Sequence, residues 1–212
     1  MAAADADQPT GLAADALREQ YGEPSPIALA LIKDHLDEVH RQFVAHSPLV
    51  CIATVDEEGA PTVSPKGDAP GFVTVLDERT LLLPDRPGNN KILTLSHAAA
   101  DPRVALLFFV PGVREMLRVH GDAEVTQEPS LLEHGRANGR LPPSALLVRV
   151  RTAYLHCGKA AIRAKLWDPE RHVEPGTLPS LGKVLTEQRL VETRDTEALD
   201  ELVEQTYRQT LY

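Results

Sequence analysis

Three short segments of the sequence combine a backbone turn with basic side chains, and together they indicate binding of an anion. The first is Ser64-Pro65-Lys66-Gly67-Asp68. The second, Asp85-Arg86-Pro87-Gly88-Asn89-Asn90-Lys91, precedes an expected helix, whose free N–H groups favour an anion. The third spaces Lys159, Arg163 and Trp167 by four residues, which on a helix places two cations and an indole ring on one face. Each alone is typical of a surface turn, but all three in a chain of net charge -9 favour a phosphate-bearing ligand.

Other chemistries lack their usual residues. The eight histidines form no His-x-x-x-His pair that shares a face with a carboxylate, and there is no Cys-x-x-Cys, so no metal site is expected. The Gly-x-Ser-x-Gly motif of serine hydrolases and the glycine motifs of Walker and Rossmann nucleotide sites are absent. No side chain stands out as a catalytic acid or base, so the catalytic residues stay unassigned.

Composition indicates a globular protein and a cytoplasmic location, and it disfavours nucleic-acid binding and a membrane span. The chain has 212 residues, of which 42% are hydrophobic and 25% charged, as in ordinary globular proteins. Its acidic charge disfavours nucleic acid as a partner. A membrane span would need about 18 consecutive apolar residues, and none occur. Two cysteines and an N-terminus without signal-peptide features suit the cytoplasm, which is the expected location.

The elements that must position these segments follow from hydrophobic periodicity. Residues 1–25 lack sustained periodicity and are expected to form a mobile arm. Ser25-Pro26 is a good helix start, and apolar residues then recur every three or four positions to Phe43, which predicts one helix ending near His46. A main domain over residues 26–170 and a C-terminal loop-and-helix extension over residues 171–212 complete the expected organisation.

Short β-branched or alternating segments separated by turn residues dominate the middle of the chain. Strands are expected at 49–55, 60–64, 71–76, 80–83, 103–110, 113–126 and 145–157. Helices are expected at 91–99, 129–138, 158–167 and from Thr196. Because most gaps are too short for crossover helices, we predict an α+β fold in which an antiparallel sheet of six or seven strands closes into a barrel with flanking helices.

The order of these motifs resembles the FMN-binding split-barrel family of pyridoxamine 5′-phosphate oxidase, from about Leu49 to Trp167. Residues 61–66, Pro-Thr-Val-Ser-Pro-Lys, stand where the oxidase has Arg-x-Val-Leu-Leu-Lys. The 85–91 loop stands where it has Thr-Asn-x-x-Ser-Arg-Lys, and residues 115–121 are similar to its Arg-Gln-Val-Arg-x-Glu-Gly strand. The residues of these motifs resemble those of a less characterised branch of the family more than those of the oxidase itself.

The resemblance implies a six-stranded split barrel that forms a homodimer, with FMN as cofactor in a groove between the subunits. It also implies which residues contact FMN. These are Ser64, Lys66, Arg86, Asn89, Asn90 and Lys91 of one subunit, with Arg118, Lys159, Arg163 and Trp167 of the second.

The resemblance further implies an FMN-dependent oxidoreductase that transfers a hydride to or from flavin N5 with an unidentified small substrate. Pro61 and Met116 replace a family arginine and glutamine, which removes two expected FMN contacts. The oxidase's Trp…Arg-x-His substrate signature is absent, so vitamin B6 phosphates are not expected as substrates. The alternatives are a non-catalytic flavin- or haem-binding protein of the same fold, with His120 or His156 of interest for haem, and a structural barrel without cofactor.

Overall fold

A computed structural model describes residues 14–211 and divides the chain into two units, residues 1–32 and 33–212. In the first unit the described residues form helices α1 (Ala14–Tyr21) and α2 (Pro26–Ala30). The expected N-terminal arm therefore falls partly outside the described residues, and its described part contains α1, a helix that the sequence pattern did not predict.

The single helix predicted from Ser25-Pro26 to about His46 is wrong. The α2 helix ends at Ala30, and the next helix, α3 (Glu38–His46), begins eight residues later. Between them Lys33 exchanges two backbone hydrogen bonds with Ala153, at 3.0 and 2.8 Å. The Asp37 carboxylate then accepts a first-turn N–H at 3.1 Å and starts α3. Pairing with the sheet and a new cap thus divide the apolar stripe into two helices.

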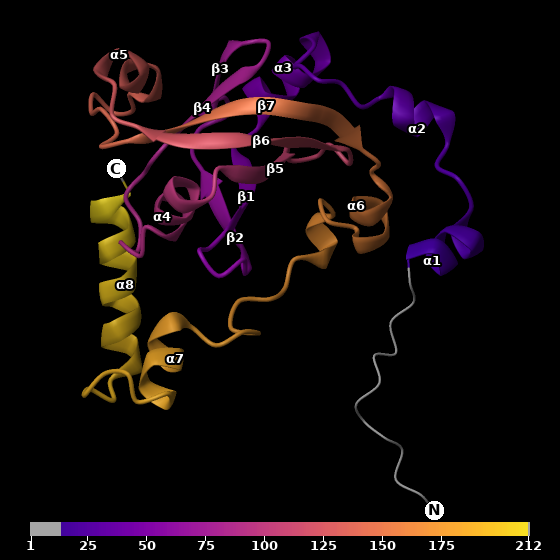
Figure 1. Ribbon diagram of the computed structural model, residues 1–212. Helices are drawn as coiled ribbons and strands as arrows, with labels where there is room; N and C mark the ends of the chain where they lie inside the picture. The colour runs from indigo at the N-terminus through magenta and orange to yellow at the C-terminus, as the bar shows by residue number, and fades with distance from the viewer. Residues whose placement is uncertain (1–13, 212) are drawn as a thin grey trace, which may run out of the picture. The chain divides into compact units, whose positions relative to one another are not determined.

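Seven strands form one antiparallel sheet, which confirms the α+β class (Figure 1). They are β1 (Leu49–Val55), β2 (Pro61–Gly67), β3 (Thr74–Asp77), β4 (Thr80–Pro84), β5 (Arg103–Phe109), β6 (Met116–Thr126) and β7 (Ala145–His156). Their order is β2-β1-β5-β6-β7-β4-β3. Each segment read from the sequence as extended contributes a strand, so the count of six implied by the resemblance is wrong. The edge strands β2 and β3 do not pair with each other, so the sheet is not closed and the predicted closure into a barrel is wrong.

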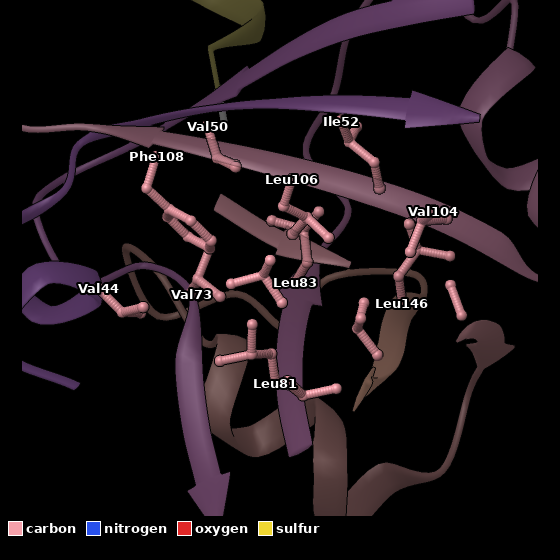
Figure 2. Close-up of a cluster of buried hydrophobic side chains, with 14 of the residues drawn as sticks. Val44, Val50, Ile52, Val73, Leu81, Leu83, Val104, Leu106, Phe108 and Leu146 are labelled. Carbon is pink, nitrogen blue, oxygen red and sulfur yellow. The ribbon is translucent and has the colours of Figure 1, made fainter. Parts of the chain in front are cut away.

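The sheet curls around one hydrophobic core. Figure 2 shows Leu106 and Phe108 of β5 pointing toward Leu81 and Leu83 of β4, and all four side chains are buried. Because β6 and β7 lie between β5 and β4 in the hydrogen-bonded order, contact between their side chains requires a strongly curved sheet. Each such side chain contributes about 1.5–3 kcal/mol on burial. Backbone pairing leaves the sheet open, and packing of this core keeps its strands curved around a common centre.

Short helices complete the chain. They are α4 (Leu93–Ala100), α5 (Pro129–Leu132), the 3₁₀ helix η1 (Glu133–Gly135), α6 (Lys159–Ala164), the 3₁₀ helix η2 (Pro169–Arg171), α7 (Leu181–Glu187) and α8 (Thr196–Thr210). The predicted final helix is confirmed as α8, which is capped by Asp195. The unpredicted α7 packs on α8, and the Gly182 N–H donates to the Asp200 carboxylate at 2.8 Å. None of the described helices is long and apolar enough to cross a membrane.

Candidate functional site

A pocket of about 550 Å³ lies between β2 and the β4–α4 loop (residues 85–92). Six of the ten residues predicted to bind a cofactor line it: Ser64, Lys66, Arg86, Asn89, Asn90 and Lys91. Its volume is within the range of about 300–1,000 Å³ that is typical of small-molecule sites. The fold thus brings the first two basic segments of the sequence together at one site.

Strand β2 presents its polar residues to the pocket by its two-residue period. Ser64 and Lys66 lie on the same side of the strand, and Val63 and Pro65 lie on the other. The Lys66 ammonium is 3.6 Å from the carboxylate of Asp85, the first residue of the loop. The pocket therefore contains a lysine that is held in place by a partly buried carboxylate.

The β4–α4 loop is strained where it lines the pocket. Asn90 and Ile92 both adopt left-handed backbone conformations, with φ of 56° and 47°. Asparagine tolerates this conformation, but a β-branched residue there costs about 1–3 kcal/mol. The Asn89 side chain accepts the Lys91 backbone N–H at 3.1 Å and closes a local turn. Such strain persists only where the surroundings impose it, and it is typical of binding loops.

The start of α4 adds backbone donors to the pocket. Ile92 is the N-cap residue and supplies no side-chain hydrogen bond to the first turn. The Leu95 N–H donates to the Ile92 carbonyl at 3.0 Å, which leaves the N–H groups of Leu93 and Thr94, two residues that line the pocket. The exposed Lys91 precedes this turn and makes no salt bridge within the described residues. A free lysine beside uncapped N–H groups is an arrangement suited to an anion.

Arg86 lies in the pocket wall, and its guanidinium is already engaged by protein groups. Its Nε donates to the Asp68 carboxylate at 2.6 Å, and its Nη1 donates to the Gly135 carbonyl at 2.7 Å. Only 16% of the Arg86 side chain and 5% of the Asp68 side chain are exposed. Asp68 belongs to the first basic segment of the sequence, but its pairing with Arg86 was not predicted.

Arg118 lies on β6 and does not line the pocket of its own chain. Its guanidinium donates to the Tyr154 hydroxyl at 3.2 Å and lies 5.8 Å from the centre of that ring. The ring of His120 also packs edge-on against Tyr154. Burial first, and the Arg118 charge second, lower the pKa of His120, so its neutral form is favoured.

The predicted helix face of Lys159, Arg163 and Trp167 is wrong. The α6 helix ends at Ala164, and Lys165 ends it in a left-handed conformation with φ of 48°. Trp167 therefore lies beyond the helix, where its indole N–H donates to the Val113 carbonyl at 2.7 Å. Lys159 and Arg163 remain exposed, one turn apart on α6, and neither lines the pocket.

The two positions that depart from the family pattern also lie away from the pocket. Pro61 begins β2 and lines a separate hollow of about 440 Å³, and Met116 is buried on β6. Several pocket residues carried no functional signal in the sequence. These are Ile92, Leu93, Thr94, Leu95 and Pro143, which the fold brings to the same cavity. No group of three or more potential metal ligands occurs among the residues that the structure describes.

The fold is thus an open antiparallel sheet with flanking helices, and its pocket is lined by charged and amide side chains. The sequence model described as pyridoxamine 5′-phosphate oxidase matches residues 36–157, more than half of the chain. The protein belongs to this family. No curated protein matches its sequence.

Solved structures with a similar fold were also found. HupZ of Group A Streptococcus is 20% identical over 56% of this chain and 92% of its own, with a TM-score of 0.47. A provisionally assigned pyridoxamine 5′-phosphate oxidase of Lactobacillus delbrueckii is 26% identical over 57% and 95%, with a TM-score of 0.45. An FAD-binding protein of Mycobacterium smegmatis is 18% identical over 58% and 98%, with a TM-score of 0.40.

Proposed function

We propose that the protein is a homodimeric FMN-dependent oxidoreductase acting on a small molecule other than a vitamin B6 phosphate. The observation that carries this proposal is the pocket between β2 and the β4–α4 loop, in which lysines, amides and uncapped N–H groups converge. FMN has a dianionic phosphate that such a set of donors recognises. When bound, FMN supplies hydride exchange at flavin N5.

The pocket residues divide into two chemical groups that suit the two ends of FMN. Lys91 and Lys66 provide the positive charge, although Lys66 is also paired with Asp85, and Ser64, Asn89 and Asn90 provide neutral hydrogen-bonding groups. Ile92, Leu93 and Leu95 also line the cavity and add apolar surface. The protein's part in the reaction is thus to bind and orient the cofactor and to set the charge around it.

Support for the homodimer comes from the outer face of the sheet, formed by alternate residues of β1, β2 and β5. It comprises Cys51, Ala53, Pro61, Val63, Pro65, Ala105, Leu107 and Phe109. Val63 is 65% exposed, and Leu107 and Phe109 are only partly buried. Arg118 pairs with Leu107 and so lies on this same face. A second subunit covering the face would bury apolar surface and place Arg118 at the interface.

The test begins with the purified protein and has separate readings for binding and for catalysis. We expect equimolar FMN to co-purify or to bind on addition, and light scattering to report a dimer. Anaerobic reduction of the bound flavin by NADH, NADPH or a reduced deazaflavin would support an oxidoreductase.

The contrary outcomes separate the alternatives. Bound flavin that none of these donors reduces would favour a carrier or sensor, and a haem absorbance band would favour haem binding. A dimer that takes up neither cofactor would refute the proposed function.

A further inference from the structure

The pocket lies in a seam of the sheet, which we define as the gap between the end of β2 with the adjoining Asp68 on one side and the β4–α4 loop on the other. In the hydrogen-bonded order β2 is at one edge and β4 is next to the other edge, with β1, β5, β6 and β7 between them. No backbone strand pairing joins β2 to β4 within residues 33–211. The two walls of the pocket must therefore be held together by side chains.

Two salt bridges cross this seam, and the cation is on the β2 side in one and on the loop side in the other. Lys66 of β2 approaches Asp85 of the loop at 3.6 Å, and Asp68, just beyond β2, accepts from Arg86 of the loop at 2.6 Å. Each side of the seam thus contributes one cation and one anion. We call these four residues the ionic clasp.

The Asp68–Arg86 pair is the more buried half of the clasp. The Asp68 side chain is 5% exposed and the Arg86 side chain 16%, against 21–25% for the other pair. A buried carboxylate is stable only when it is paired and hydrogen-bonded, so the pair is costly to open. Arg86 also donates to the Gly135 carbonyl. Gly135 packs closely on the end of β4, since a Cβ added there would lie 2.8 Å from Pro84. One guanidinium therefore connects β2, the loop and η1.

We infer that Asp68 is a positioning residue of the binding pocket, which acts by holding Arg86 and, through Arg86, the β4–α4 loop. Asp68 does not line the pocket, so its effect on a ligand must pass through Arg86 and the loop. The clasp holds Lys91 and the amides of the loop against the β2 wall. This inference rests on the proposed function for the identity of the ligand, which is FMN.

The experiment is a double-mutant cycle with Asp68→Asn, Arg86→Gln and the double variant, using the full chain. FMN affinity is measured by quenching of flavin fluorescence, and unfolding of the cofactor-free protein is measured alongside it. We expect each single variant to weaken FMN binding about 10- to 100-fold, because binding must then order a loop that the lost charge-assisted contact held in place. The double variant should bind no worse than either single variant, because all three lose the same support.

The chain offers a matched control pair. Asp34 and Arg79 are also 2.6 Å apart, but they are exposed and do not line the pocket. Asp34→Asn and Arg79→Gln should leave the FMN affinity unchanged. An Asp68→Asn variant with normal affinity, beside a weakened Arg86→Gln variant, would show that Arg86 binds the ligand directly and would overturn the inference. Lower unfolding temperature with unchanged affinity would assign the pair to stability alone and would also overturn it.

A second measurement does not depend on FMN. Hydrogen exchange of the cofactor-free Asp68→Asn protein should accelerate in residues 85–92 and stay unchanged in the paired strands β6 and β7. Unaltered exchange in the loop would contradict the clasp. If the wild-type protein fails to bind FMN while the loop does loosen in the variant, the proposed function fails and the positioning role of Asp68 stands.

Discussion

Replacement of Lys91 by glutamine tests whether the pocket recognises a phosphate. Lys91 is exposed, makes no salt bridge within the described residues and precedes the uncapped first turn of α4. Its removal should leave the free energy of unfolding within about 0.5 kcal/mol of the wild-type value, as for ordinary surface positions. Its proposed contact with the phosphate is charge-assisted and contributes about 1.5–3 kcal/mol. We therefore expect the Kd for FMN to rise about 10- to 150-fold.

The assay compares FMN with riboflavin, which has the same ring but no phosphate. The Lys91→Gln variant should lose affinity for FMN and keep its affinity for riboflavin, and the loss should shrink at high salt because screening weakens the wild-type contact. Lys183→Gln is the matched control, since Lys183 is an exposed α7 lysine that forms a surface pair with Glu187 at 3.8 Å and lies outside the pocket. Equal losses for FMN and riboflavin, or no loss for either, would refute the reasoning.

Two further predictions concern folding rather than binding. A Cβ at Gly121 would lie 2.3 Å from the Arg149 carbonyl, at the irregularity between β6 and β7, so Gly121→Ala should lower the free energy of unfolding by about 1–3 kcal/mol; urea denaturation that shows no change would contradict this geometry. Burial lowers the pKa of His40 below its usual 6.5, although the Asp37 charge opposes the shift. The contribution of neutral His40 to the free energy of unfolding is therefore complete above pH 6.5. It is lost as the pH falls through the lowered pKa, because the unfolded chain binds the proton more readily than the folded chain. Urea titrations at several pH values should show wild type losing stability relative to His40→Gln on acidification, and parallel curves would exclude His40 as the cause.

Local patterns were sufficient to predict most of the elements. The alternation of Leu117, Val119 and Gly121 with polar residues predicted a strand, and β6 is a strand. The turn-rich loop before an expected helix proved to be the β4–α4 loop followed by α4. These features depend on neighbours in the chain, because steric preferences and the two-residue or 3.6-residue period act over a few residues.

Features that depend on distant partners were not predictable in this way. The helix expected to continue to His46 is interrupted because Lys33 pairs with Ala153, a residue 120 positions away in the chain. The predicted face containing Trp167 fails because Lys165 adopts a left-handed conformation and the indole bonds to the β5–β6 connection instead. No local spacing carries information about either partner.

The sequence by itself determined the α+β class, the extended segments and the two basic segments that line the pocket. Only the tertiary structure decided that Lys66 and Lys91 line one cavity, that the sheet stays open, and that Asp68 holds Arg86. The physical reason is that curling of the sheet, driven by burial of a shared core, brings β2 and the end of β4 together across the seam. A charge pair across such a gap depends on that curvature, which no short stretch of sequence encodes.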